Sequence, residues 1–260
     1  MTTRVTWAAA SACAALSLAI AGCSDESGSA QPVSTPAATT LTSTVIASAS
    51  PTSAASAPTT TAAAQGIQPL VVPVSGSQGS TTYDVHLPQV SGGPEAVRQR
   101  FNSGMRATLD DLLKPASDTT ITDGTLAHDE RSRVTTITPN VVAGVAIYNW
   151  YGKGAAHPNN SVATITINAN TAAPVLFSDV FTNPTAAAQE LAAAVDRIDP
   201  QAAPTAPVVE SFANWVPLPE GFHTYVPVAH ALGDYLPVTV PWSEIAGQLK
   251  PGVQHMLAGS

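Results

Sequence analysis

The chain has 260 residues, with 10 Lys or Arg, 18 Asp or Glu and a formal net charge of −8 at pH 7. This excess of acid argues against nucleic-acid binding, because phosphate contacts need clustered Lys and Arg side chains. It favours the attraction of cationic partners at low ionic strength. Only two cysteines occur, Cys13 and Cys23. The fold is therefore expected to depend on core packing rather than on disulfides.

The first residues have the three parts of a secretory signal peptide. Arg4 supplies a positive charge, an apolar run covers 7–20, and small residues follow. The run is shorter than the roughly 20 residues that a transmembrane helix needs. The sequence Ile-Ala-Gly-Cys at 20–23 resembles the bacterial lipobox, in which the cysteine is acylated and the chain is cut before it. We therefore predict a signal peptide at 1–22 and lipidation of Cys23.

These features predict an extracytoplasmic protein that a lipid anchor holds on the bacterial cell membrane or envelope, since two or more acyl chains bind a bilayer stably. Loss of residues 1–22 removes Arg4 and leaves 9 basic and 18 acidic residues, a net charge of −9. Residues 23–66 include the lipidated cysteine and are dominated by Ser, Thr, Ala and Pro. Such a composition buries too little apolar surface to fold. It predicts a disordered tether ahead of one folded domain at 67–260.

Short apolar or alternating segments bounded by Gly, Pro and Asn predict strands in this domain. The expected strands are 71–74, 83–87, about 119–127, 132–138, 141–151 and 161–168, with further short strands broken by proline within 207–241. The glycines from Gly76 to Gly79 predict the turn between the first two strands. A final helical turn is expected from Ser243.

Two segments have the periodicity of amphipathic helices. One begins at Gly93-Pro94 and ends before Pro115, and the other begins at Asn183-Pro184 and ends before Pro200. The apolar stripes are Val97, Phe101, Met105, Thr108 and Leu112 in the first, and Ala188, Leu191, Val195 and Ile198 in the second. Strands combined with two segregated helices predict the α+β class, with an antiparallel or mixed sheet in a single domain.

The most distinctive segment is Tyr-Gly-Lys-Gly-Ala-Ala-His-Pro-Asn at 151–159. It resembles the Gly-Ala-His-Pro signature of the RsiV-like extracellular domain family. That family includes the C-terminal domain of a lysozyme-sensing anti-sigma factor and secreted mycobacterial immunogenic proteins. Other segments that resemble the family, in the same order, are 83–113, 175–181, 227–233 and 238–245.

The resemblance implies a domain that binds a protein or another ligand. The anti-sigma factor carries a sigma-binding segment and a transmembrane helix ahead of this domain, where the present chain has the expected signal, lipobox and tether. Sigma-factor capture is therefore not expected. Ala155 also stands where many relatives have a second glycine, so the local backbone is expected to differ.

The expected ligand-binding residues are His157, Tyr151, Asn159 and Tyr225. Aromatic residues with polar tips are favoured where a surface is half-buried and binds something. His157 lies between small residues and a proline, so its ring is expected either to contact a ligand or to hold the backbone of a tight connection. Phe212 and Phe222 are expected in the core.

Esterase activity on acyl esters, as claimed for some secreted relatives, is the enzymatic alternative. It would need a serine, a base and a carboxylate, and Ser161, His157 and Asp179 are the candidates. The chain has no Gly-x-Ser-x-Gly elbow, which nucleophilic serines of this kind often occupy. The six histidines have no metal-ligand spacing, so no metal and no cofactor are expected.

Taken as a whole, the sequence predicts a tethered lipoprotein whose domain is noncatalytic and binds an envelope glycan or a cationic, lysozyme-like protein. A weak serine-type esterase is the alternative. The sequence does not determine the oligomeric state.

Overall fold

The computed structural model describes residues 66–259. The expected signal peptide and the expected tether up to residue 65, including the lipidation site at Cys23, lie outside the described residues. The described part has the predicted α+β fold, with helices combined with a six-stranded sheet and a three-stranded sheet. No helix within this range is both long and apolar enough to cross a bilayer.

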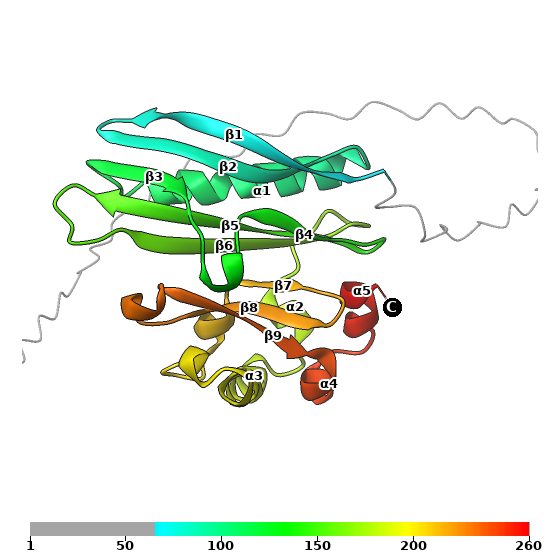
Figure 1. Cartoon of the computed structure of the whole chain (residues 1–260). Coiled ribbons are helices and arrows are strands. Elements are labelled where there is room, and N and C mark those ends of the chain that lie inside the picture. The colour runs from blue at the N-terminus through cyan, green and yellow to red at the C-terminus, as the bar shows by residue number, and fades with distance from the viewer. Residues whose placement is uncertain (1–65, 260) are drawn as a thin grey trace, which may run out of the picture. The chain divides into compact units, whose positions relative to one another are not determined.

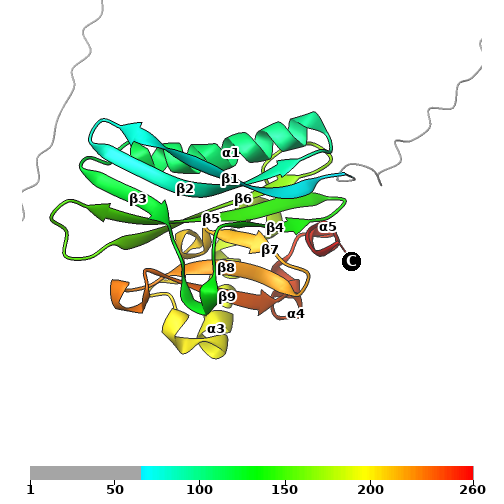
Figure 2. The same ribbon diagram turned by 45° about the horizontal axis from the view of Figure 1, so that its top comes forward.

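The larger sheet is mixed (Figures 1 and 2). Its strands are β1 (Gln68–Gln78), β2 (Thr81–Ser91), β3 (Thr119–Asp123), β4 (Arg133–Ile137), β5 (Val141–Gly152) and β6 (Asn159–Asn168). β2 pairs with β3 in parallel, whereas the other pairings are antiparallel. β5 lies in the middle, because it pairs with β3, β4 and β6. The first turn lies at 79–80 rather than at 76–79, since Gly76 is paired within β1.

β5 is the central strand because its residues are apolar on both faces. Every residue from Val141 to Tyr148 is buried, which is typical of a strand that is covered on both sides. Val142, Ala146 and Tyr148 belong to the core under helix α1 (Glu95–Leu113). Gly144 lets this helix approach closely, because a Cβ there would lie 2.8 Å from Phe101 Cζ.

The other face of β5 packs on the smaller sheet. That sheet is antiparallel and consists of β7 (Trp215–Pro217), β8 (Gly221–Pro227) and β9 (Tyr235–Pro241). Val145 and Ile147 of β5 share a core cluster with Val216 and Tyr225 of the smaller sheet. The two sheets therefore pack face to face.

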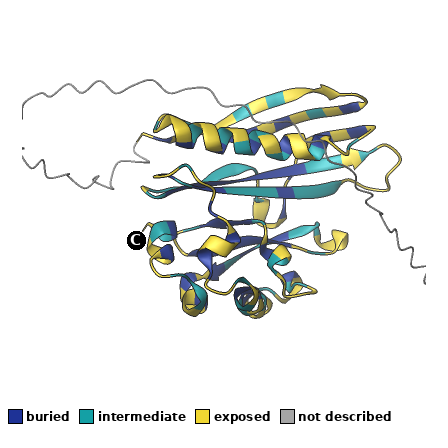
Figure 3. Ribbon diagram, turned by 180° about the vertical axis from the view of Figure 1, so that it is seen from behind, coloured by how far each residue is buried: buried dark blue, intermediate teal, exposed yellow. Residues whose placement is uncertain are grey.

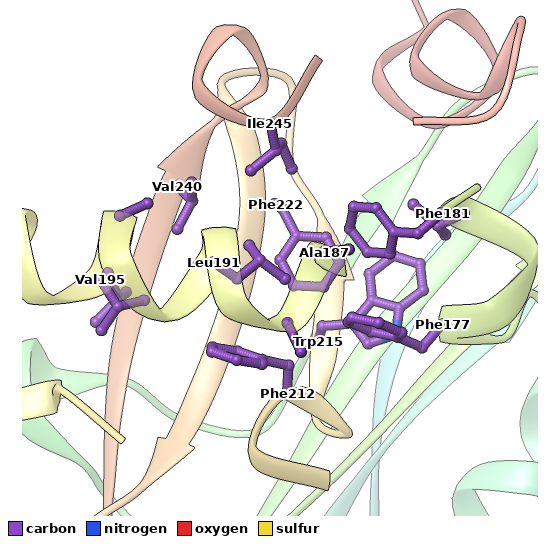
Figure 4. Packing of buried hydrophobic residues seen from close by; sticks show 14 of the residues in the cluster. Phe177, Phe181, Ala187, Leu191, Val195, Phe212, Trp215, Phe222, Val240 and Ile245 are labelled. Atoms are coloured by element: carbon purple, nitrogen blue, oxygen red, sulfur yellow. The ribbon is translucent and has the colours of Figure 1, made fainter. Parts of the chain in front are cut away.

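Two helices, α3 (Pro184–Ile198) and α4 (Trp242–Ile245), cover the outer face of the smaller sheet (Figure 1). The short helices α2 (Phe177–Val180) and α5 (Val253–Ala258) contribute buried residues to the core that this sheet shares with α3 and α4. Phe222 and Val240 from the sheet, Leu191 from α3 and Ile245 from α4 lie in one cluster, which Figure 4 shows. The described chain thus has the layer order helix, sheet, sheet, helix. Short 3₁₀ segments connect these elements, among them Ala127–Asp129, Val209–Phe212 and His230–Leu232.

Both predicted helices exist, but their buried stripes differ from the predicted ones at the C-terminal ends. In α1 the buried residues are Val97, Phe101, Met105, Leu109 and Leu113, which form the inner stripe in Figure 3. Leu109 and Leu113 thus replace Thr108 and Leu112, because the contact with the sheet follows a row of residues at steps of four, which is inclined to the helix axis. In α3 the cap at Asn183 forms as predicted and accepts from the Ala186 N–H.

The prediction that Ile198 belongs to the buried face of α3 is wrong. Ile198 is 44% exposed and is the last residue of α3. Ala187 and Ala194 are buried instead. Two other core predictions are confirmed, since Phe212 and Phe222 are fully buried.

Candidate binding site at the end of the β5–β6 hairpin

The distinctive segment at 151–159 connects β5 to β6 as a hairpin. The two strands pair in antiparallel up to Trp150 and Asn159. Gly154 adopts a φ of +87°, a left-handed conformation that glycine adopts with little strain. Tyr151 is 42% exposed, and its hydroxyl donates to the Ala155 carbonyl at 3.0 Å. The ring is therefore held at the surface in a defined place. Below, "the hairpin end" means residues 150–159.

His157 contacts a turn that follows β8. Its imidazole stacks on that of His230, with ring centroids 3.6 Å apart and planes 11° apart. His230 Nδ1 lies 2.8 Å from Asp234 Oδ1, and the other oxygen of Asp234 accepts from the Asn160 N–H at 2.7 Å. The Asn160 side chain donates to the Gly233 carbonyl at 3.2 Å. These contacts fasten the hairpin end to the smaller sheet.

Two cavities lie beside the hairpin end. The larger has a volume of about 350 Å³, and its walls are mainly apolar; they include Leu112, Pro115, Ala116, Ser117, Thr119, Ile121, Trp150 and Gly152. The smaller, of about 300 Å³, is lined by Ser80, Asp118, Thr119, Thr120, Tyr151 and Lys153. Thr119 lines both. The two cavities thus meet at Thr119 but lie on opposite faces of the sheet, because Trp150 and Tyr151 are consecutive residues of a strand.

The polar cavity carries one charge of each sign. Neither Lys153 nor Asp118 forms an ion pair with another residue in the described range, so both charges face solvent or a ligand. The backbone holds them together, because the Lys153 N–H donates to the Asp118 carbonyl at 2.8 Å. Asp118 itself donates its N–H to Ser80 Oγ at 2.9 Å and has a φ of +48°. The residues that line this polar cavity can therefore form hydrogen bonds with ligands rich in hydroxyl and amide groups.

Tyr225 lies elsewhere, and the expectation that it is a surface residue is wrong. It is fully buried between the two sheets, because its place on β8 faces β5. Its hydroxyl donates to Glu130 Oε1 at 2.7 Å, and Arg133 donates to the same oxygen. Burial, first of all, and the neighbouring carboxylate raise the pKa of Tyr225. The phenol stays protonated and acts as a structural donor.

His223 belongs to the same buried group. Its Nδ1 lies 2.8 Å from Thr239 Oγ1, while its Nε2 is buried without a hydrogen-bond partner and lies 4.0 Å from Glu130 Oε1. Burial lowers the pKa of His223, more than the facing carboxylate raises it. The neutral imidazole therefore dominates at neutral pH. Two residues ahead of Glu130, His128 has a φ of +60°, so this loop is held in a conformation that few L-residues adopt.

The three residues of the proposed esterase triad lie on three different elements. Ser161 is on β6, paired with Tyr148, and His157 is stacked on His230. Asp179 Oδ2 accepts from the Leu176 N–H at 2.9 Å at the start of α2. No hydrogen bond joins any two of the three in the part of the chain that the structure describes. Within the same residues no group of three or more His, Cys, Asp or Glu could hold a metal ion.

The structure brings together three of the four expected ligand-binding residues, Tyr151, His157 and Asn159, at the hairpin end. Sequence reasoning missed their neighbours Asp118 and Asp234. Both have positive φ angles, which turns often require, but nothing in the sequence indicates which turn meets which hairpin.

No family model matches the chain, and no curated protein matches it. Among solved structures, a member of the DUF3298 family from Bacteroides fragilis is similar, with a TM-score of 0.53 and 11% identity over 75% of this chain and 99% of that chain. A DUF3298 family protein from Pseudomonas aeruginosa has a TM-score of 0.45 and 12% identity over 72% of this chain and 95% of that chain. The first likeness shows a shared fold. The resemblance to the RsiV-like domain stays a prediction.

Proposed function

We propose that this protein is an envelope-anchored lipoprotein whose domain binds an extracytoplasmic ligand at the hairpin end. The observation that carries the proposal is the pair of cavities at Trp150 and Tyr151, one on each face of the sheet, which meet at Thr119. Pockets for small ligands have volumes of roughly 300–1,000 Å³ and combine apolar walls with a few polar groups. Both cavities are at the lower end of that range, so a segment of a larger molecule fits them better than a large compact ligand.

A carbohydrate segment of the cell envelope suits this surface best. Sugar rings present apolar C–H faces and a polar edge of hydroxyl and amide groups. A glycan chain that passes round the end of β5 would place one sugar ring on the exposed ring of Tyr151 and another against the wall formed by Trp150. The charged groups of Asp118 and Lys153 would take the polar edge.

A cationic, lysozyme-like protein is the second candidate, and the charge of the chain favours it. The net charge of −8 would steer such a partner toward the domain at low ionic strength. This complex would weaken as salt is added, because screening shortens the Debye length to about 10 Å at 0.1 M.

The binding test uses calorimetry on the purified full-length protein with soluble peptidoglycan fragments. Tyr151→Ala should weaken binding by tenfold or more, because loss of a central aromatic anchor typically removes about 2 kcal/mol. The matched control is Ile198→Ala, which removes a similarly exposed apolar side chain, 44% against 42%, far along the chain on α3. Equal affinities for the two variants would refute binding at the hairpin end.

Two further measurements separate the alternatives. If lysozyme forms a complex with the protein at low salt and the complex is lost at 0.5 M salt, the ligand is the cationic protein rather than a glycan. Turnover of short p-nitrophenyl esters that disappears in both Ser161→Ala and His157→Ala would overturn the noncatalytic proposal in favour of the esterase.

The anchor has its own test. Cells that express the wild-type chain should incorporate labelled palmitate into it and retain it in the membrane fraction. Cys23→Ser should abolish both. Retention of label in the Cys23→Ser variant would overturn the proposed lipidation site.

A further inference from the structure

The outer edge of β6 carries backbone groups that have no partner. β6 pairs with β5 along one side only. On the other side, the Thr166 carbonyl accepts from the Val175 N–H at 2.8 Å, so the peptide groups of Thr166 point away from β5. Residues two apart in a strand point their peptide groups in the same direction. The N–H and C=O groups of Val162 and Thr164 therefore also point outward, and in the described part of the chain no hydrogen bond joins them to another residue.

This open stretch, residues 162–166, is called the β6 edge below. It is bounded by Asn160, whose N–H donates to Asp234 at 2.7 Å, and by the contact between Thr166 and Val175. Between these ends, the residues 163–165 are all partly exposed. An unpaired strand edge is a template for a further strand. Proline weakens such an edge because it has no N–H; β1, at the opposite edge of the sheet, contains two prolines and β6 contains none.

One apolar hollow lies on each side of the β6 edge. The hollow beside α1 has a volume of about 430 Å³, and Gly104, Ala107 and Ile165 are among its lining residues. The hollow on the opposite face has a volume of about 300 Å³ and is lined in part by Thr164 and Trp215. Thr164 and Ile165 line different hollows because successive side chains of a strand point to opposite faces. Recognition by strand addition uses this arrangement, in which backbone groups bind an extended segment and hollows take its alternate side chains.

Apolar side chains are left exposed beside the same edge. Leu176, which lines the second hollow, is 56% exposed, and Val208 is 45% exposed next to the lining residue Val209. Arg100 lines the hollow beside α1 and Glu210 the other. One charge of each sign gives no preference for a charged occupant, whereas the exposed apolar side chains favour an uncharged segment with aliphatic residues.

The chain itself contains such a segment ahead of the described residues. Residues 39–46 read Thr-Thr-Leu-Thr-Ser-Thr-Val-Ile, and six of the eight are the β-branched residues Thr, Val or Ile, which are enriched in strands. No charge and no proline occurs between 37 and 50. Within 24–65, Leu41, Val45 and Ile46 are all the large aliphatic residues except Val33. The expected tether thus contains one stretch with the composition of a strand.

We propose that residues 39–46 bind to the β6 edge as an added strand of the larger sheet. Alternation along an extended segment places Leu41 and Val45 on one face and Ile46 on the other. Each of the two hollows would therefore receive at least one aliphatic side chain, while the backbone of the segment pairs with the N–H and C=O groups of Val162 and Thr164.

The connecting chain is long enough for this contact. The nineteen residues 47–65 separate the segment from Gly66, and an extended chain covers about 3.3 Å per residue, or about 60 Å. β1, where the described chain begins, is separated from β6 by β2, β3 and β5, a distance of about 20 Å at roughly 4.8 Å between neighbouring strands. A linker of this kind also gives the segment an effective concentration near about 1 mM, so weak intrinsic affinity is sufficient.

Amide hydrogen exchange of the full-length protein, measured by NMR, tests the proposal. The double variant Thr44→Pro/Val45→Pro removes two successive N–H groups, one of which must point toward the β6 edge whatever the register. Exchange at Val162 and Thr164 should be about tenfold faster in this variant than in the wild type, which corresponds to a bound fraction of about 90% in the wild type. Thr60→Pro/Thr61→Pro is the matched control in the same tether and should leave the exchange unchanged. Equal exchange in the wild type and the 44/45 variant, or equal acceleration in both double variants, would overturn the proposal.

A second pair of variants tests the hollow beside α1. Ala107 is exposed, so Ala107→Arg should preserve the fold while it fills this hollow, and exchange at Val162 and Thr164 should again become faster. Ala193→Arg, at an exposed position on α3, is the control and should have no effect. Protection that survives Ala107→Arg would refute binding at this edge. Protection that depends on protein concentration over an about tenfold range would identify a second copy as the occupant, because only association between molecules follows mass action, and would also overturn the proposal.

Discussion

The contact between the hairpin end and the smaller sheet depends on Asp234, and replacing this residue tests that dependence. Asp234 is 15% exposed at its side chain and accepts from the Asn160 N–H at 2.7 Å and from His230 at 2.8 Å. It also has a φ of +72°, where a side chain other than Asn or Asp is strained. One residue thus carries two hydrogen bonds and a left-handed backbone conformation, and three substitutions separate these contributions.

Asp234→Asn keeps one acceptor and tolerates the left-handed backbone, so it should destabilise the protein by about 1 kcal/mol. Asp234→Gly loses both hydrogen bonds without steric strain and should lower the free energy of unfolding by about 2 kcal/mol. The bond to His230 contributes the smaller part, because that imidazole is 41% exposed and water competes for it. Asp234→Ala adds backbone strain to the lost bonds, so its cost should exceed that of the glycine variant by about 1 kcal/mol.

Urea unfolding followed by circular dichroism measures these free energies. Hydrogen exchange supplies the local readout, because the Asn160 amide should lose protection in the Gly and Ala variants and keep much of it in Asp234→Asn. We predict that the free energy of unfolding falls least in Asp234→Asn, more in Asp234→Gly and most in Asp234→Ala. An alanine variant as stable as the asparagine variant would refute the reasoning, since neither the hydrogen bonds nor the strain would then matter.

Two further perturbations test residues of β8 in the smaller sheet. Gly221→Ala should destabilise the protein by more than about 2 kcal/mol, because a Cβ would lie 2.2 Å from the Val240 carbonyl oxygen and a well-packed core resists added volume; Gly247→Ala, which has open space around it, should be close to neutral in the same unfolding assay. His223 has a folded-state pKa that burial holds below the usual value near 6.5, so the unfolded chain binds the proton more tightly and stability should fall as pH drops through about 6.5 toward the lowered value. His223→Gln should flatten this part of the profile measured by urea unfolding between pH 7.5 and 5, and an unchanged slope would contradict the assignment.

Local sequence patterns predicted most of the elements because their signals are short-range. The segment 141–151 was correctly predicted as a strand, and the helix starts at Pro94 and Asn183 follow from the residue types preferred at helix starts. The predictions that failed concern residues whose burial depends on contacts with distant parts of the chain. Ile198 fits the period of α3 but is exposed in its final turn. Tyr225 has a polar tip but is buried, because Glu130 from another loop accepts a hydrogen bond from its hydroxyl.

The residues of the candidate site also divide into those that the sequence indicates and those that only the structure places there. Tyr151, His157 and Asn159 could be selected from one distinctive segment, since they are neighbours in sequence. The partners that define their environment come from elsewhere: Asp118 from the start of β3, and His230 and Asp234 from the turn after β8.

The central claim is that the hairpin end is a ligand-binding surface, and mapping the amide shifts of the full-length protein by NMR during titration with peptidoglycan fragments tests it most directly. The predicted result is a saturable set of shifts at 150–159 and at Asp118 and Thr119, which line the adjoining cavities. Shifts confined to other surfaces, or no saturable shifts with either these fragments or lysozyme, would contradict the account.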